Sequence, residues 1–284
     1  MQIPYVTGKW SVLFKPKKTG RYINDHTIVR DDDGAWHLFG ITSFKGGATN
    51  ERYFAHGVTD SLAKPMLEEM PAIDRGTLAW APGVIREGDV YYMFYGPSPT
   101  MLATSFDLYE WYGHKITLED EPLFVAHRDH FVLKIGKSEW LMYVVGTKDK
   151  RGCVSLFRSK NLIDWKFSGY ALTSGADAPL TPAWGAIESP FVIEKDGLYY
   201  LFVTYTDSKR ESYNNTLVFV SKDPTSFGEY NGENGGAMPV TKIFAHAPEI
   251  IRDGEDWYIT TCGWRGYKDV PNKGCVSIAK LEWK

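Results

Sequence analysis

The stretch ESPFVIEKDGLYYLFVT, residues Glu188–Thr204, carries the pattern that decides the fold. An apolar run is followed by Asp196-Gly197 and then by a second run that is rich in aromatic residues. Two short apolar runs joined by Asp-Gly predict a β-hairpin, because the tight turn needs a backbone conformation that glycine adopts readily. The hairpin does not explain Glu188, an acidic residue at the entrance of the first strand.

The same pattern occurs four more times along the chain. Each copy runs from a polar or aromatic residue, through a small or acidic one, into an apolar strand, a glycine-containing turn and an aromatic-rich strand. Further strand-like pieces follow each hairpin, so each repeat of about 50 to 60 residues predicts an antiparallel sheet of about four strands. The other copies begin at Asn24, Trp80, Arg128 and His246, and the predicted turn glycines are Gly34, Gly88, Gly136, Gly197 and Gly254.

Five such repeats predict an all-β, single-domain five-bladed β-propeller of four-stranded antiparallel blades over residues 1–284. The chain has 284 residues, of which 43% are hydrophobic, so it can bury a core of this size. The fifth repeat lacks an outer strand of its own, because the chain stops soon after VSIAKLEW, residues 276–283. We expect WSVLFKP, residues 10–16, to supply that strand and to close the ring.

Charge and composition limit the partners and the location that the sequence predicts. A formal net charge of −3 gives no overall attraction to nucleic acid or to an anionic membrane, so neither is expected as a partner. The N-terminus MQIPYVTGKW lacks the pattern of a secretion signal. As given, the chain is expected to be cytoplasmic, or secreted or periplasmic if a signal has been removed. The three cysteines, without a close CxxC pair, predict packed strand residues rather than disulfides or a zinc site.

The starts of the five predicted inner strands carry unlike residues at equivalent positions. In a propeller the innermost strand of each blade lines the central channel, and the residues at its start face one end of that channel. Structural repetition predicts similar residues at equivalent positions, so this diversity indicates a function. The first positions are Asn24, Trp80, Arg128, Glu188 and His246, and the second positions are Asp25, Ala81, Asp129, Ser189 and Ala247.

Three carboxylates, those of Asp25, Asp129 and Glu188, are predicted to converge on the channel from blades 1, 3 and 4. Like charges in a confined site repel one another, so the pKa of at least one carboxyl group is expected to be raised. Glycoside hydrolysis uses one carboxylic acid to protonate the leaving oxygen and one carboxylate to activate water or to attack the anomeric carbon. A third carboxylate can tune and orient the acid.

These motifs resemble those of glycoside hydrolase family 43, which includes arabinofuranosidases, xylosidases and arabinanases, and of its relatives, the family 32 and 68 fructosidases. The family 43 resemblance implies that Asp25 is a general base, Asp129 a pKa-modulating residue and Glu188, in an E-x-P motif, the general acid. Asn24-Asp25 and Arg128-Asp129 also resemble the N-D-P and R-D-P motifs of families 32 and 68, in which the first aspartate is a nucleophile. This chain departs from these patterns by having His26 and His130 where proline is usual.

The remaining candidate residues concern sugar and metal binding. Asn24 and Arg128 are expected to contact the substrate, and Trp80 and Trp184 to stack on a sugar ring. The motif WAP, residues 80–82, is similar to the family 43 motif whose tryptophan shapes the sugar pocket. The resemblance implies that His246 faces the channel, where water, calcium or substrate are open alternatives. No cofactor is required, although a structural calcium ion in the channel is consistent with the resemblance.

The sequence therefore predicts an exo-acting glycosidase for pentose sugars or another furanoside, with an oligosaccharide or glycoside as substrate. The family 43 resemblance favours inversion, with Asp25 as base. One alternative is a retaining fructosidase-like enzyme with Asp25 as nucleophile. The other is a non-catalytic carbohydrate-binding propeller, because histidine in place of both prolines could shift the strand starts.

Overall fold

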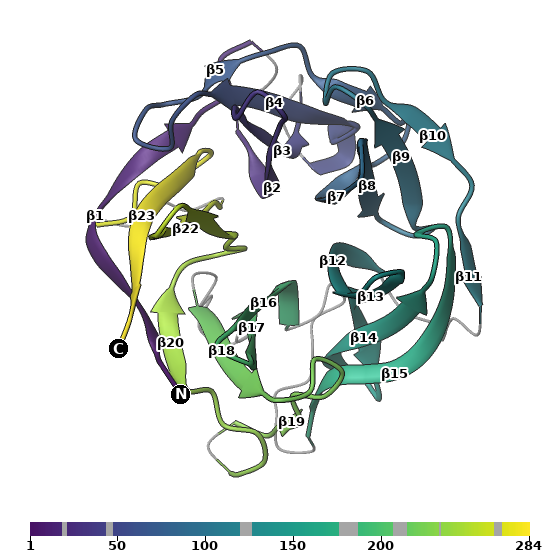
Figure 1. Cartoon of the computed structure of the whole chain (residues 1–284), viewed down its shortest axis with the longest axis vertical. Helices are drawn as coiled ribbons and strands as arrows, with labels where there is room; N and C mark the ends of the chain where they lie inside the picture. The colour runs from purple at the N-terminus through teal and green to yellow at the C-terminus, as the bar shows by residue number, and fades with distance from the viewer. Residues whose placement is uncertain are drawn as a thin grey trace.

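The computed structural model describes residues 1–18, 22–43, 48–119, 127–175, 187–206, 215–232, 234–263 and 269–284. These residues form five β-sheets arranged around a central axis, with the innermost strand of each sheet beside that axis (Figure 1). The only helical element among them is one 3₁₀ turn, η1 (Ala48–Asn50). The predicted all-β five-bladed propeller is therefore confirmed.

The blades follow one another in chain order, and each is built from the inside outward. Blade 1 contains β2 (Asn24–Arg30), β3 (Trp36–Thr42), β4 (Tyr53–Thr59), β5 (Leu67–Glu68) and β6 (Ala72–Asp74). Blade 2 contains β7 (Trp80–Glu87), β8 (Val90–Gly96), β9 (Met101–Ser105) and β10 (Tyr112–His114). Blade 3 contains β12 (Arg128–Gly136), β13 (Glu139–Lys148), β14 (Arg151–Ser159) and β15 (Asp164–Ser174), with β11 (Thr117–Glu119) and β19 (Glu229–Tyr230) added to β15. Blade 4 contains β16 (Ile187–Lys195), β17 (Leu198–Tyr205), β18 (Asn215–Ser221) and β20 (Thr241–Phe244), and blade 5 contains β21 (Ile250–Asp253), β22 (Asp256–Thr261), β23 (Val276–Trp283) and β1 (Pro4–Phe14).

The two ends of the chain share blade 5. Strand β1 pairs antiparallel with β23, from Pro4 opposite Trp283 to Phe14 opposite Val276. This confirms that an N-terminal segment supplies the outer strand, although the strand covers residues 4–14 rather than the predicted 10–16. Figure 1 shows the purple N-terminal strand lying beside the yellow C-terminal one. Joining the ends in one sheet closes the ring of blades.

Two blades differ from the predicted four-stranded antiparallel sheet. Blade 1 has five strands, because β5 and β6 both pair with β4. Blade 3 has six, because β11 and β19 each add to β15 in parallel. β5 and β6 lie on the connection from β4 to blade 2, β11 on the connection from blade 2 to blade 3, and β19 between β18 and β20 of blade 4. Each pairs along a sheet edge that would otherwise be unpaired.

In four of the five hairpins the predicted turn glycine has the positive φ that a tight turn needs. Gly34, Gly88, Gly197 and Gly254 have positive φ values of 89°, 60°, 75° and 62°. The prediction is wrong for Gly136, because that residue ends β12 and pairs with Glu139, so the turn lies at residues 137 and 138.

The core consists of apolar side chains that pack between neighbouring blades. Inner strands approach closely: a Cβ atom added to Gly83 of blade 2 would lie 2.0 Å from the carbonyl oxygen of His130 in blade 3. The three cysteines are buried and free. Cys153 lies in β14 as predicted, whereas Cys262 follows the end of β22 and Cys275 precedes β23, so the strand prediction is wrong for these two.

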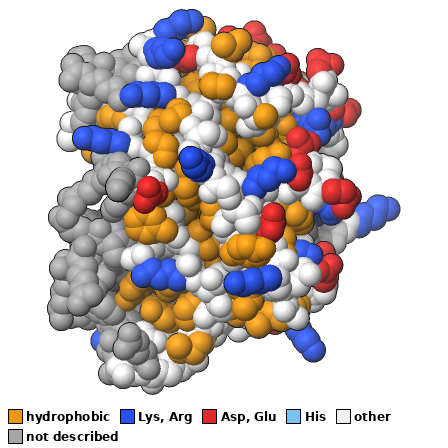
Figure 2. All heavy atoms as spheres, turned by 90° about the vertical axis from the view of Figure 1, so that its left-hand side faces the viewer, with side chains coloured by type: hydrophobic (Ala, Val, Ile, Leu, Met, Phe, Trp, Pro, Cys, Tyr) orange, Lys and Arg blue, Asp and Glu red, His pale blue; other side chains and the backbone are white. Residues whose placement is uncertain are grey.

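Basic and acidic side chains are interspersed with hydrophobic ones on the outer side of the propeller shown in Figure 2. Among the described residues no helix is long and apolar enough to span a membrane.

Candidate active site

A backbone irregularity at the start of the inner strand in blades 1 to 4 positions the candidate residues. In blade 5 the equivalent residues, His246 and Ala247, lie just before β21 rather than at the predicted strand start. The second residue has a positive φ in all five blades, and pairing with the next strand shifts at the same place in blades 1 to 4. Such a bulge bends the strand and re-aims the side chains beside it. Positive φ is uncommon outside glycine and is best tolerated by aspartate and asparagine, which explains the small or acidic residues found there. The values are 23° for Asp25, 47° for Ala81, 58° for Asp129, 50° for Ser189 and 44° for Ala247.

Arg128 joins blades 3 and 4 at this end of the channel. Its Nη2 atom donates a hydrogen bond to Glu188 Oε1 at 2.8 Å, and its Nε atom lies 3.4 Å from Asp129 Oδ1. The backbone N–H of Ser189 donates to Asp129 Oδ2 at 3.0 Å, so Asp129 is fixed from both blades. Arg128, Asp129 and Glu188 are all buried. The structure thus brings together two of the three predicted carboxylates around one guanidinium group.

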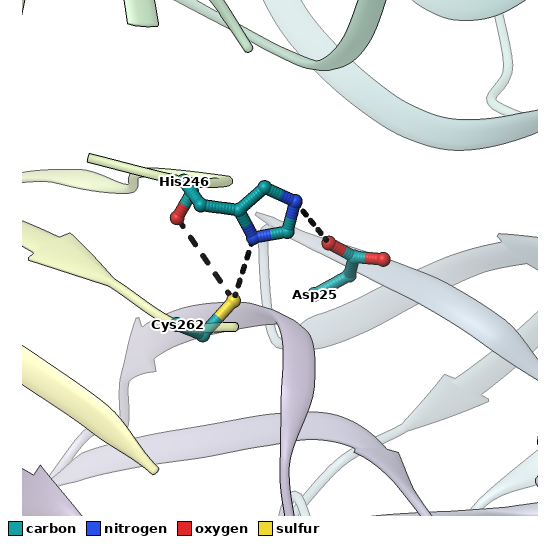
Figure 3. A group of neighbouring side chains, drawn as sticks. All are labelled: Asp25, His246 and Cys262. Atoms are coloured by element: carbon teal, nitrogen blue, oxygen red, sulfur yellow. Dashed lines mark hydrogen bonds and ion pairs between the residues drawn. The ribbon is translucent and has the colours of Figure 1, made fainter. Parts of the chain in front are cut away.

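His246 connects the third carboxylate to this group. Its Nε2 atom lies 3.6 Å from Glu188 Oε2 and 4.0 Å from Asp25 Oδ1, so one imidazole nitrogen stands near both carboxylates. Figure 3 shows the ring of His246 between Asp25 and Cys262. Blades 1, 3, 4 and 5 therefore contribute charged or titratable side chains to one cluster, as the sequence predicted for Asp25, Asp129, Glu188, Arg128 and His246.

The three carboxyl groups have different proton affinities. Burial, together with repulsion from Asp129, raises the pKa of Asp25 to about 7. Burial also raises the pKa of Asp129, against the opposing charge of Arg128. For Glu188 burial acts in the same direction, but the nearby His246 and the charge of Arg128 outweigh it, and the pKa lies below its usual value. Without substrate, a proton in this cluster is therefore held by the two aspartates in preference to Glu188.

Cys262 lies between His246 and Asn24 and contacts both. The thiol of Cys262 donates to Asn24 Oδ1 at 3.5 Å, and its sulfur lies 3.7 Å from His246 Nδ1. Asn24 is buried, so the predicted substrate-binding residue contacts Cys262 instead of lying open at the channel mouth. The sequence did not predict Cys262 as part of the site, because it lies 16 residues after His246, just beyond the end of β22.

The residues around His246 do not match the ligands of a calcium ion. Ligand atoms of Asp25, His246 and Cys262 lie within 4.8 Å of one another. Calcium prefers six to eight oxygen ligands, whereas this set offers one carboxylate with a nitrogen and a sulfur. Burial also raises the pKa of Cys262 well above its usual value, and a neutral thiol is a poor metal ligand. A calcium ion in the channel stays a prediction that these three residues do not support.

The predicted stacking residues are only partly located. Trp80 begins β7 at the position equivalent to Arg128 and Glu188, is half-buried, and lies beside Glu51. The buried carboxylate of Glu51 accepts a hydrogen bond from Tyr22 OH at 2.7 Å. Trp184 lies outside the described residues.

A small cavity of about 30 Å³ lies in the channel beside the cluster. Its walls come from the second and third residues of all five inner strands, and they include Asp25, Asp129 and Ser189. The histidines that follow the two aspartates also line it.

A family model described as the glycosyl hydrolases family 32 N-terminal domain matches residues 14–261 of the chain. No curated protein sequence matches the chain.

Solved structures share the fold at low sequence identity. The family 32 β-fructofuranosidase BmSUC1 of Bombyx mori superposes with a TM-score of 0.64 at 18% identity, over 96% of this chain and 61% of its own. The chain thus spans about three fifths of that enzyme's length. CoXyl43, a family 43 β-xylosidase/α-arabinofuranosidase from a compost microbial metagenome, gives a TM-score of 0.66 at 14% identity, over 99% and 96% of the two chains. The family 43 endo-arabinanase of Bacillus licheniformis gives 0.65 at 17% identity, over 95% and 98%.

Proposed function

The chain belongs to the glycosyl hydrolases family 32 N-terminal domain family, and from this premise we propose that it is a glycoside hydrolase that cleaves furanoside bonds. The observation that carries the proposal is the cluster of half-buried Asp25 with buried Asp129 and Glu188, gathered from three blades around Arg128 and His246. Three carboxylates crowded together and largely shielded from water cost stability, and such clusters mark catalytic sites. The substrate class is an oligosaccharide or simple glycoside.

The proposed roles follow from the positions of the carboxylates. Glu188 protonates the glycosidic oxygen as the bond to the leaving group breaks. Asp25 acts at the anomeric carbon, either directly or through a water molecule. Asp129, held by Arg128 and by the N–H of Ser189, tunes the charge around Glu188.

A proton must move before Glu188 can act as an acid, because the ligand-free site favours the proton on the aspartates over Glu188. His246 Nε2 lies within 4.0 Å of both carboxylates, so the imidazole is placed to relay the proton from Asp25 to Glu188. This single transfer produces both reactive groups, an ionised Asp25 and a protonated Glu188. The relay gives His246 a role in the proposed reaction, and that role needs no bound metal ion.

Two stereochemical courses use these residues, and the family 32 match favours retention. In that course ionised Asp25 attacks the anomeric carbon and forms a glycosyl ester while Glu188 protonates the leaving oxygen. Water then cleaves the ester, and Glu188 takes the proton of that water. The preferred substrate is then a β-fructofuranoside, the class named for the Bombyx mori enzyme.

The inverting course remains the second candidate, because two family 43 neighbours align over nearly their whole lengths. Asp25 then deprotonates a water molecule for in-line attack, and pentose furanosides or xylosides are the substrates. Exo action stays a prediction for either course.

Product analysis with a substrate panel tests both candidates. The panel contains sucrose, a fructan oligomer and the nitrophenyl arabinofuranosides and xylosides, and proton NMR identifies the first-formed anomer. Retention on a fructofuranoside supports the main proposal, and inversion on a pentoside supports the second. A wild type as inactive as Glu188→Gln on every substrate, with measurable sugar binding, would identify a carbohydrate-binding propeller instead.

A further inference from the structure

The residue type at the third of the equivalent positions depends on the residue type at the second. Histidine follows the two aspartates, whereas proline follows the small residues of the other three blades. All five second residues share the left-handed backbone conformation, so this conformation does not itself require histidine. The correlation therefore links the histidines to the aspartates rather than to the fold. The pairs are Asp25-His26 and Asp129-His130 against Ala81-Pro82, Ser189-Pro190 and Ala247-Pro248.

The Nε2 atom of each histidine contacts a threonine hydroxyl of a neighbouring blade. His26 Nε2 lies 2.7 Å from Thr260 Oγ1, which belongs to β22 of blade 5. His130 Nε2 lies 2.8 Å from Thr100 Oγ1, just before β9 of blade 2. Both threonines are buried. The two rings are therefore held in fixed orientations by the same kind of contact.

The loop that presents Thr100 is itself well anchored. Arg75 Nη1 donates hydrogen bonds to the carbonyl oxygens of Gly96 and Pro97 at 2.8 and 3.0 Å. This anchoring fixes the position of the ring of His130 through Thr100.

In the described part of the chain, the Nδ1 atoms of the two histidines lack such a partner. His26 Nδ1 and His130 Nδ1 are buried and have no hydrogen-bond partner among the described residues, and the same holds for Ser189 Oγ. All three residues line the cavity of about 30 Å³ beside the carboxylates. A buried polar atom without a partner carries the full cost of its desolvation. A cavity of this size accommodates about one or two water molecules, which typically bond to several such atoms.

A metal ion does not explain these nitrogens. Among the described residues, the one group of three histidine, cysteine or acidic ligand atoms within 4.8 Å is Asp25, His246 and Cys262, which includes neither His26 nor His130. Burial lowers the pKa of His26 to about 3 and that of His130 well below its usual value. Both rings are neutral, so each offers one N–H group and one lone pair for hydrogen bonding.

We propose that His26 and His130 are positioning residues that hold bound water beside Asp25 and Asp129 and so fix the orientation of these carboxylates. The role rests on the proposed glycoside hydrolase function. It also gives a physical reason for histidine at the two positions where the resembling families carry proline.

Glutamine and asparagine substitutions separate the two ring nitrogens. A glutamine amide takes the place of Nε2 and can still reach the threonine, whereas an asparagine amide takes the place of Nδ1. Misplaced carboxylates reduce the rate more than they reduce binding, so we expect His26→Gln and His130→Gln to lower kcat by about tenfold or more at a similar KM. We expect the two asparagine variants to keep most of the wild-type kcat.

The matched control is His114→Gln, in the exposed pair between His114 Nε2 and Thr104 Oγ1 (2.6 Å) on the outer part of blade 2. We expect this variant to keep the wild-type kcat and Tm. A glutamine variant of His26 or His130 with wild-type kcat would overturn the proposal. The proposal would also be overturned if the glutamine and asparagine variants all lost kcat and all showed an equal fall in Tm.

A crystal structure tests the water independently of activity. If the wild type hydrolyses no substrate, the proposed function fails, but the positioning role is still decided by the electron density in the cavity. We expect ordered water within hydrogen-bond distance of His26 Nδ1 and His130 Nδ1, lost in the glutamine variants together with a rotation of the Asp25 or Asp129 carboxylate. A dry cavity in the wild type, or unmoved carboxylates in the variants, contradicts the proposal.

Discussion

The two ends of the central channel are built from the same five strands but have opposite chemistry. At or just before the start of the strands, Asp25, Asp129, Glu188, Arg128 and His246 form a polar cluster that is buried except for half-buried Asp25. Further along the same strands lies a cavity of about 300 Å³ with mainly apolar walls, which include Val84, Val132 and Ile251. The arginines of that cavity are engaged elsewhere: Arg30, for example, pairs with Asp253 and lies over the Trp36 ring.

This difference shows that function and stability are separated along each inner strand. The first two residues differ from blade to blade and gain polar partners from other blades. The later residues resemble one another and contribute to the apolar core. Glu249 lines both cavities, and burial raises the pKa of its carboxyl group well above the usual value.

The largest expected effect comes from removing the acid at the polar end. General acid catalysis contributes about 10²- to 10⁴-fold, so Glu188→Gln is expected to lower kcat by a factor in this range without changing the fold. The loss should be smaller on nitrophenyl glycosides, because a good leaving group needs less protonation. Steady-state kinetics on both substrate types measure this.

Glu194→Gln is the control, because Glu194 is an exposed residue near the other end of β16. Equal losses from Glu188→Gln and Glu194→Gln would remove the distinction between the two ends of the strand.

The pH dependence of kcat/KM reports on the proton shared by the polar end. If Asp25 must pass its proton to Glu188, the reactive form is lost when that proton dissociates, with a pKa of about 7. We therefore expect kcat/KM to fall about tenfold per pH unit above pH 7. A pH–rate profile for the free enzyme measures this, and a kcat/KM that rises through pH 7 would rule out the relay through His246.

Removing the charge of Asp25 is expected to abolish activity and to stabilise the fold. The folded protein holds the Asp25 proton more tightly than the unfolded chain does, since its pKa is about 7 rather than 3.8. Stability from this group is therefore full below pH 3.8 and is lost as the pH rises through 7. We expect Asp25→Asn to raise the free energy of unfolding at pH 8 by up to about 4 kcal/mol, and by less as the pH falls toward 4.

Denaturant unfolding at both pH values tests the effect of Asp25→Asn. A variant that is less stable than the wild type at pH 8 would show that Asp25 has a net stabilising role.

Packing between blades 2 and 3 is sensitive to a single added methyl group. A Cβ atom at Gly83 would meet the carbonyl oxygen of His130 at 2.0 Å, so one blade must shift. We expect Gly83→Ala to cost about 1–3 kcal/mol of unfolding free energy, the usual range for overpacking. Gly113→Ala is the matched control, because a Cβ atom there meets nothing within 4 Å. Similar Tm values for both variants would contradict this account.

The smallest effect is expected at the apolar end. Ile251 is buried and lines the larger cavity, so Ile251→Val should cost about 0.5–1.5 kcal/mol and leave kcat unchanged. Calorimetry and kinetics on the same preparation measure both quantities. A changed kcat at unchanged stability would show that the two ends are coupled.

The departure at His26 and His130 could have been interpreted more fully from the sequence. Histidine stands in place of proline at both positions, and this replacement alone favours a non-catalytic propeller. The correlation of histidine with aspartate and of proline with small residues is visible in the sequence alone. Its meaning requires the structure, because Thr100 and Thr260 lie in other blades, 30 and 234 residues away from His130 and His26.

The sequence by itself determined the repeat, the five blades, the closing N-terminal strand and the positions at which the carboxylates stand. These features depend on local patterns: the two-residue period of strands, turn glycines, and a second position restricted to small or acidic residues by its positive φ. The tertiary structure decided which side chains meet across the channel, such as Arg128 with Glu188 and His246 with Cys262. It also decided the order of the carboxyl pKa values, because burial and charge–charge distances depend on how the blades close around the axis.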